Sequence, residues 1–98
     1  MAVGSIEEVR NQIDRLDQQI VALIAQRSQF VRLAASFKKD ENAVRAPDRV
    51  QKVIDKVRAQ AAQHGLPESI AEEVYRAMIN AFIAYELEQH QQLSDAKS

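Results

Sequence analysis

The stretch that decides the fold spans residues 5–39 and reads SIEEVRNQIDRLDQQIVALIAQRSQFVRLAASFKK. Apolar side chains recur in it every three or four residues, which is the spacing of one face of an α-helix. It begins with Ser5 and Glu8, the partners of a capping box, in which each side chain satisfies a backbone N–H of the first turn. No Gly or Pro interrupts the stretch, so we predict one helix over residues 5–39. Its apolar positions are Ile6, Val9, Ile13, Leu16, Ile20, Leu23, Ile24, Val31, Ala34 and Ala35.

Proline and glycine punctuate the rest of the chain and indicate two further helices. Pro47 is suited to the first turn of a helix over 47–63, and Gly65 to the stop that follows it. Pro67 opens a helix over 67–91 that is apolar around much of its circumference, so we expect it to be contacted on two faces. The apolar positions of these two helices are Val50, Val53, Ile54, Val57 and Ala61, then Ile70, Val74, Ala77, Met78, Ile79, Ala81, Phe82, Ile83 and Tyr85.

The segments between and after these helices are polar. Residues 40–46 are expected to form a loop and residues 92–98 a polar tail, while Glu72 and Glu73 are expected to lie on a solvated face. The sequence therefore predicts an all-α fold of three helices, one of them very long, in a single domain over residues 1–98.

Composition excludes several classes of protein. The 98 residues carry 13 basic and 14 acidic side chains, a net charge of −1 that argues against a nucleic-acid partner held by bulk charge. Two Gly and two Pro are too few for a dinucleotide-binding or phosphate-loop fold, and the absence of Cys excludes a thiolate nucleophile and a Cys-ligated metal. His64 and His90 lack metal-ligand spacing. We see neither a signal peptide nor an apolar run near the ~18 residues of a membrane span, so we expect no membrane partner and a cytoplasmic location.

The length of the first predicted helix bears on assembly. Thirty-five residues make a helix about 52 Å long at 1.5 Å per residue. A compact domain of this size has a radius of gyration of only about 13 Å. Because the apolar face continues to Ala35 and Phe37, its far end needs cover from outside the chain's own globule. A second copy is the simplest cover, and we expect a homodimer or a larger homo-oligomer.

Three basic residues lie on or beside the apolar face of this helix. Arg27 and Lys38 point in the direction of that face and are about 16 Å apart along the axis. One interpretation is that they extend to solvent or pair with buried carboxylates. The other is a cationic pocket for a small anion, since no acidic residue lies on the face near Arg27. Arg10, at the edge of the face, is about 25 Å from Arg27, so it would join such a pocket from the partner chain.

The segments 9–17 and 20–27, followed by Lys38, resemble the first helix of the all-helical, AroQ-type chorismate mutases. The resemblance continues through residues 46–50 and 65–66 into the third helix and covers roughly residues 5–90. It implies an intertwined helical homodimer with two equivalent sites that rearranges chorismate to prephenate without a metal or cofactor. One branch of this family, isochorismate-pyruvate lyase, instead splits isochorismate to salicylate and pyruvate.

The resemblance also assigns roles to the basic residues. It implies that Arg27 binds one carboxylate of the dianionic substrate and that Arg10 of the other chain binds the second. Lys38 would contact a carboxylate and the ether oxygen whose bond breaks, and Arg49 would complete the positive wall. These roles suit a pericyclic reaction, which needs a substrate held in its reactive conformer and charge stabilised as the C–O bond breaks.

Glu86 occupies the position where many mutases carry a Gln that donates a hydrogen bond to the ether oxygen. An ionised Glu only accepts hydrogen bonds, so Glu86 would help only when protonated. An apolar pocket favours the neutral acid, while nearby Arg and Lys oppose it. We therefore expect activity to rise as pH falls and Glu86→Gln to flatten this profile. The alternative is that Glu86 is a solvated surface acid.

Val50 stands where many mutases place a Glu that contacts the substrate hydroxyl. A Val at this position resembles the sequences of the lyase branch. The expected activity is therefore chorismate mutase, with isochorismate-pyruvate lyase as the alternative in the same family. A non-catalytic helical dimerisation module is the hypothesis from another class. Against it stand Arg10, Arg27, Lys38 and Arg49, because a pure scaffold has no reason to keep cations in its apolar seam.

Overall fold

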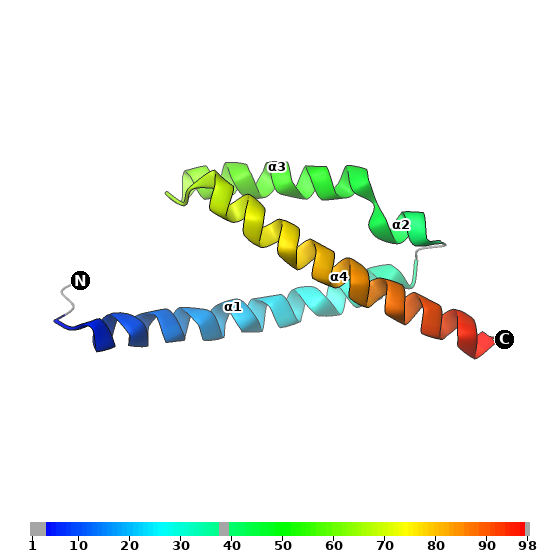
Figure 1. Ribbon diagram of the computed structural model, residues 1–98, viewed down its shortest axis with the longest axis horizontal. Helices are drawn as coiled ribbons and strands as arrows, with labels where there is room; N and C mark the ends of the chain where they lie inside the picture. The colour runs from blue at the N-terminus through cyan, green and yellow to red at the C-terminus, as the bar shows by residue number, and fades with distance from the viewer. Residues whose placement is uncertain (1–3, 38–39, 98) are drawn as a thin grey trace. The chain divides into compact units, whose positions relative to one another are not determined.

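The protein is all-α in its computed structural model, which describes residues 4–37 and 40–97 (Figure 1). The elements in chain order are α1 (Ile6–Ala35), α2 (Glu41–Arg45), α3 (Pro47–Gln63) and α4 (Glu68–Lys97). The three long helices confirm the predicted fold class. The chain divides into two compact units, Met1–Phe30 and Val31–Ser98. Within the described ranges, no helix is long and apolar enough to cross a membrane.

The first unit is helical from Ile6 onward and begins with the predicted cap. The backbone N–H of Glu8 donates to Oγ of Ser5 at 3.2 Å, and the N–H of Gly4 donates to Oε2 of Glu8 at 2.8 Å. The return bond thus reaches Gly4, one residue before its usual position. Most large apolar side chains of this unit are exposed; Ile20, for example, is 51% exposed. We call the exposed apolar row the α1 stripe; it comprises Ile6, Ile13, Leu16, Ile20 and Leu23.

The first helix ends earlier than its apolar pattern predicted. After Ala35 the chain tightens into a turn, in which Ser36 N–H donates to the Leu33 carbonyl at 3.2 Å and Phe37 N–H to the Ala34 carbonyl at 3.0 Å. The Ser36 hydroxyl also donates to the Leu33 carbonyl at 2.6 Å. A serine hydroxyl competing for a helix carbonyl favours such an end. The expectation of a helix through residues 36 and 37 was therefore wrong, and the last two expected residues, 38–39, lie outside the described part.

The expected loop over residues 40–46 contains a short helix, α2. Oδ1 of Asp40 accepts the backbone N–H of Ala43 at 2.8 Å and thereby caps it. Val44 is only 2% exposed, and α2 contacts α4. A capping Asp and one buried Val thus give this segment a structure that its polar composition did not predict.

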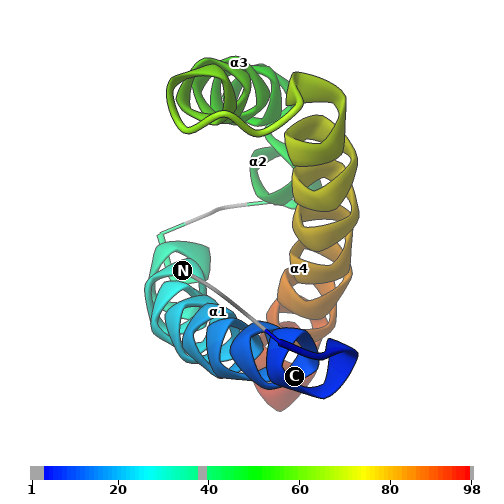
Figure 2. The same ribbon diagram turned by 90° about the vertical axis from the view of Figure 1, so that its left-hand side faces the viewer.

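Helices α3 and α4 form a hairpin, residues 47–97, and lie side by side next to their turn (Figures 1 and 2). Pro47 occupies the first turn of α3, as predicted. The predicted stop is a Schellman motif, in which Leu66 N–H donates to the Ala61 carbonyl at 2.8 Å and Gly65 N–H to the Ala62 carbonyl at 3.4 Å. Gly65 adopts φ 75°, a left-handed conformation that favours glycine.

The core of the second unit lies between these helices. Ile54, with 1% of its surface exposed, is the most deeply buried large side chain of α3. On α4, Ala71 and Ile79 are buried, whereas Ile70 and Val74 are exposed, so a single chain does not cover the second face of α4 at these two positions. Helix α4 also continues to Lys97, beyond the end expected at residue 91. The buried apolar residues of the described unit are Ala35, Val44, Ile54, Val57, Ala61, Ala71 and Ile79.

Candidate functional site

The start of α3 places two of the predicted site residues, Arg49 and Val50, in one helical turn. The N–H of Val50 donates to the carbonyl of Ala46 at 3.0 Å, so the turn that carries both residues closes on Ala46. Arg49 is exposed and Val50 is half-buried. A cleft of ≈ 550 Å³ opens at this turn; its lining residues are Ala43, Ala46, Pro47, Asp48, Arg49 and Lys52.

The predicted cations of the first helix differ in their exposure to solvent. Arg10 is exposed, whereas Arg27 is half-buried and its Nη1 atom is buried. Both lie on α1, about 25 Å apart at 1.5 Å per residue. One chain therefore does not bring Arg10 and Arg27 to the same small ligand. Lys38, the third predicted cation of this segment, lies outside the described residues.

Glu86 is the buried ionisable side chain of α4. Only 3% of its surface is exposed, so the alternative that it is a solvated surface acid is wrong. Burial of a carboxyl group costs free energy unless the group is neutral or well partnered. Its burial makes Glu86 a candidate for a functional role.

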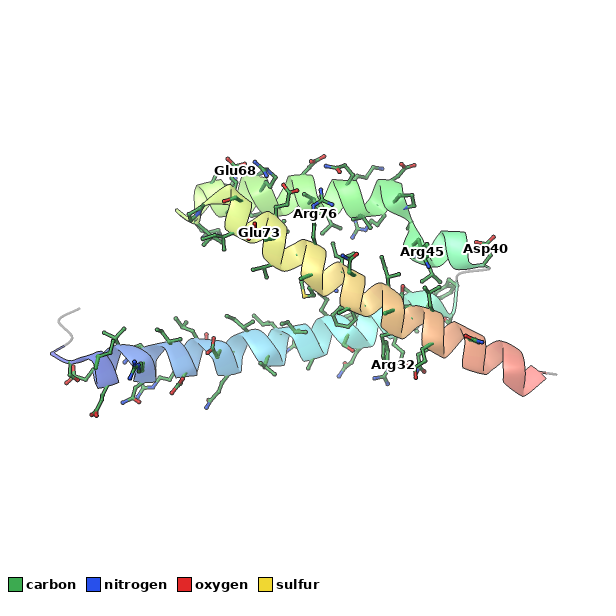
Figure 3. All side chains as sticks on the ribbon, viewed as in Figure 1. Arg32, Asp40, Arg45, Glu68, Glu73 and Arg76 are labelled. Atoms are coloured by element: carbon green, nitrogen blue, oxygen red, sulfur yellow. The ribbon has the colours of Figure 1, made fainter. Side chains whose placement is uncertain are left out.

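A cluster of charges that the sequence reasoning missed joins the two helices of the hairpin. Arg58 of α3 donates a hydrogen bond to Glu72 of α4, and its Nε lies 3.6 Å from Glu68. Arg76 donates to the same Glu72 at 2.7 Å. Figure 3 shows Glu68 and Arg76 on the part of α4 that lies beside α3. The hydrogen bonds from Arg76 and Arg58 lower the pKa of the Glu72 carboxyl.

The expectation of a solvated face holds for Glu73, which is exposed, whereas Glu72 is half-buried and its carboxylate links the two helices. Part of this cluster was visible in the sequence. Glu72 and Arg76 are four residues apart, which is the favourable order for an ion pair on one helix face. The partner across the hairpin, Arg58, carries no such local signal, because it is 14 residues away.

A second hollow, of ≈ 250 Å³, lies at the turn between α3 and α4. It is almost entirely apolar, and Leu66, Ile70 and Val74 contribute to it. His64 also lines it, but among the described residues no group of three or more His, Asp or Glu could hold a metal ion. No Arg or Lys lines this hollow, so its chemistry suits apolar groups and not an anion.

The described site residues share one kind of chemistry. Arg10, Arg27 and Arg49 are permanently charged donors that match the geometry of carboxylates. Glu86 adds a buried group that donates a hydrogen bond when protonated. Side chains of these types are suited to contacting a carboxylate or an oxygen atom on which negative charge develops.

Comparison with known proteins gives three findings. The family model described as "Chorismate mutase type II" matches residues 9–87. An isochorismate pyruvate lyase from Pseudomonas aeruginosa is 30% identical over 91 residues, which cover 93% of this chain and 90% of that protein. A chorismate mutase from Methanocaldococcus jannaschii is 26% identical over 78 residues, or 79% of each chain.

Proposed function

Because the chain belongs to the chorismate mutase type II family, we propose that it is an enzyme that rearranges chorismate to prephenate in a cationic pocket. The observation that carries this proposal is the family match over residues 9–87, which includes Arg10, Arg27, Lys38, Arg49 and Glu86. The product would then supply the biosynthesis of aromatic amino acids.

The proposed roles follow the charges of the substrate. Arg27 binds one carboxylate, and Arg10 of a second chain binds the other. Lys38 donates to a carboxylate and to the ether oxygen, and Arg49 adds positive charge from the cleft at the start of α3. In the reaction the ether C–O bond breaks while a C–C bond forms within the same molecule, so no nucleophile is consumed. These cations hold the folded conformer of the substrate and stabilise the charge that grows on the ether oxygen.

We propose that the working unit is a homodimer. Two observations support it: the α1 stripe is exposed, and Arg10 is about 25 Å from Arg27 along one helix. A second chain would cover the stripe and supply Arg10 to the pocket of its partner. In this dimer the two units of each chain act as one domain.

Glu86 is proposed as the hydrogen-bond donor to the ether oxygen. Its side chain is buried, and in this role it must be protonated, because an ionised carboxylate only accepts hydrogen bonds. Activity is then expected to rise as pH falls from 8 to 5. Replacing Glu86 by Gln, which donates at every pH, is expected to flatten the profile in an assay of chorismate consumption. A wild-type profile that is flat over this range would contradict the role.

Isochorismate-pyruvate lyase is the second candidate function. Two observations favour it. The half-buried Val50 resembles the residue type found at this position in the lyase branch, and the chain is 30% identical to the lyase of Pseudomonas aeruginosa. The same cations would bind isochorismate, whose cleavage likewise breaks an ether C–O bond. The two candidate functions differ in the contact that the pocket makes with the substrate hydroxyl.

The deciding experiment incubates the purified protein with chorismate and, separately, with isochorismate. Prephenate from the first compound supports the mutase, and salicylate with pyruvate from the second supports the lyase. If neither product forms and neither compound raises the melting temperature, the chain is a non-catalytic helical module and the proposal fails.

A matched pair of arginines on α1 tests the site itself. Arg27→Ala is expected to lower kcat/KM about a hundredfold, since it removes a charge-assisted bidentate contact. Arg32→Ala removes the same charge from an exposed position on the same helix and is expected to change kcat/KM less than about twofold. Equal losses in the two variants would show that Arg27 acts through overall charge and not through a specific contact.

A further inference from the structure

Ala46 has a backbone conformation that its chemistry disfavours. Its φ of 36° and ψ of 64° lie in the left-handed region, which residues with a Cβ seldom adopt. The following Pro47 also disfavours helical backbone angles at this position and pushes the residue toward extended ones. Among the described residues, Ala46 is the single non-glycine residue whose φ is positive. Conformations of this kind persist only where the surrounding structure imposes them, and they cluster at functional sites.

The surroundings that impose this conformation are the helices on each side. Before Ala46, α2 is fixed by the Asp40 cap at its start and by Val44, which is 2% exposed, near its end. After it, α3 is fixed by Ile54, which is 1% exposed. A single residue joins two helices that are each anchored in the core. The φ and ψ of Ala46 therefore set the direction in which α3 leaves α2.

The bend at Ala46 also shapes the cleft of ≈ 550 Å³ that Arg49 lines. The Ala46 carbonyl accepts the N–H of Val50 at 3.0 Å, so the turn that carries Arg49 is built directly on this residue. Its side chain carries no hydrogen-bonding group and caps nothing, so the contribution of Ala46 lies in its backbone. Resting on the proposed function, we propose that Ala46 is a positioning residue whose left-handed backbone places Arg49 to contact the dianionic substrate.

The test compares two substitutions at Ala46. Val is β-branched and strongly disfavours a left-handed backbone, whereas Asn tolerates it. Ala46→Val is expected to raise the KM for chorismate and its calorimetric dissociation constant about tenfold, the loss of one charge-assisted contact. Ala46→Asn is expected to stay within about twofold of wild type. Ala43→Val places the same side chain at the same cleft on helical backbone and controls for bulk.

A double-mutant cycle with Arg49→Ala shows whether Ala46 acts through Arg49. When Arg49 is absent, Ala46→Val is expected to change KM by less than about twofold, because the group that it displaces is gone. If the effects of Ala46→Val and Arg49→Ala on KM multiply in the double variant, the inference is overturned and the proposed function stays intact. The same holds for an Ala46→Val variant that binds as tightly as wild type, or for a loss in the Ala43→Val control equal to that of Ala46→Val. A wild-type chain that binds neither chorismate nor isochorismate would overturn both.

Circular dichroism at the assay temperature checks that each variant is folded. If Ala46→Val fails this check, Ala46→Leu takes its place, since Leu also disfavours the left-handed region but lacks the branch at Cβ. Hydrogen exchange at the Val50 amide then follows the backbone independently of activity. Faster exchange in the Leu variant than in the Asn variant is expected, and equal exchange would contradict the imposed geometry.

Discussion

The first unit and the α3–α4 hairpin carry the same amphipathic pattern with opposite outcomes. In the hairpin, the apolar positions Ile54, Val57 and Ala61 of α3 are buried. On α1, the equivalent row from Ile6 to Leu23 is exposed, and Ile20 keeps half of its surface open. The comparison shows that an apolar helix face in the sequence predicts burial but does not identify the segment or chain that buries it. The hairpin supplies its own, whereas the α1 stripe awaits a second chain in our proposal.

The largest expected effect comes from a charge placed in the α1 stripe. If a second copy covers this stripe, Ile20→Asp buries an unpaired carboxylate in the interface, at a cost of about 4 kcal/mol. This corresponds to a dimer dissociation constant about a thousandfold weaker, which sedimentation equilibrium measures.

A matched variant distinguishes the stripe from the rest of the helix. Gln18→Asp adds the same charge on the opposite side of α1 and is expected to leave the dissociation constant within about threefold of wild type. If both variants remain as associated as wild type, the stripe is not the interface and the contrast with the hairpin needs another explanation.

An intermediate effect is expected at the turn of the hairpin. Gly65→Ala places a Cβ on a residue with φ 75°, although this Cβ would meet nothing within 4 Å. The loss of unfolding free energy is therefore a backbone cost of about 1 kcal/mol, read from urea denaturation. Gly65→Asn, which tolerates this conformation better, should lose less. Equal losses would indicate that the Schellman motif does not depend on the left-handed residue.

The smallest effect is expected from acid titration of Glu72. Its folded-state pKa lies below the ordinary carboxyl value of 4.5, because Arg76 and Arg58 donate hydrogen bonds to the ionised form. The stability that it contributes is therefore fully present above pH 4.5 and is lost as pH falls through the lowered folded-state pKa. Thermal melts between pH 3 and 7 should show a shallower pH dependence in Glu72→Gln than in wild type. Parallel curves would show that the pairs are too exposed to matter.

Local signals in the sequence predicted α3 and the turn after it closely, whereas the end of α4 was placed too early. The bounds of α3 follow from Pro47 at its start and Gly65 after its end, because both residues act through their own backbone. The end of α1 was wrong, because the Ser36 hydroxyl competes for a carbonyl in a segment whose apolar spacing still looks helical. Helix α2 was missed because its stability comes from the burial of Val44, which is a tertiary effect.

The candidate site was predictable in its residue types and less so in its geometry. Basic residues on an apolar face stand out because they interrupt the apolar pattern of their own helix. For this reason the sequence alone indicated Arg27 as a candidate site residue. Burial of Glu86 was not evident from its spacing, and the sequence alone left the surface alternative open. The bend at Ala46 was invisible, because an Ala before a Pro gives no sign of a left-handed backbone.

The open stripe of α1 has a consequence for how the protein matures in a cell. Helix α1 precedes the hairpin along the chain, so a ribosome releases its apolar residues first, before α3 and α4 exist. Under the proposed pairing, their burial waits for an encounter with another finished chain, which is a second-order event. The time that a new chain spends exposed to chaperones, proteases and aggregation then shortens as its copy number rises. Expression level would thus control the quality of folding as well as the amount of enzyme.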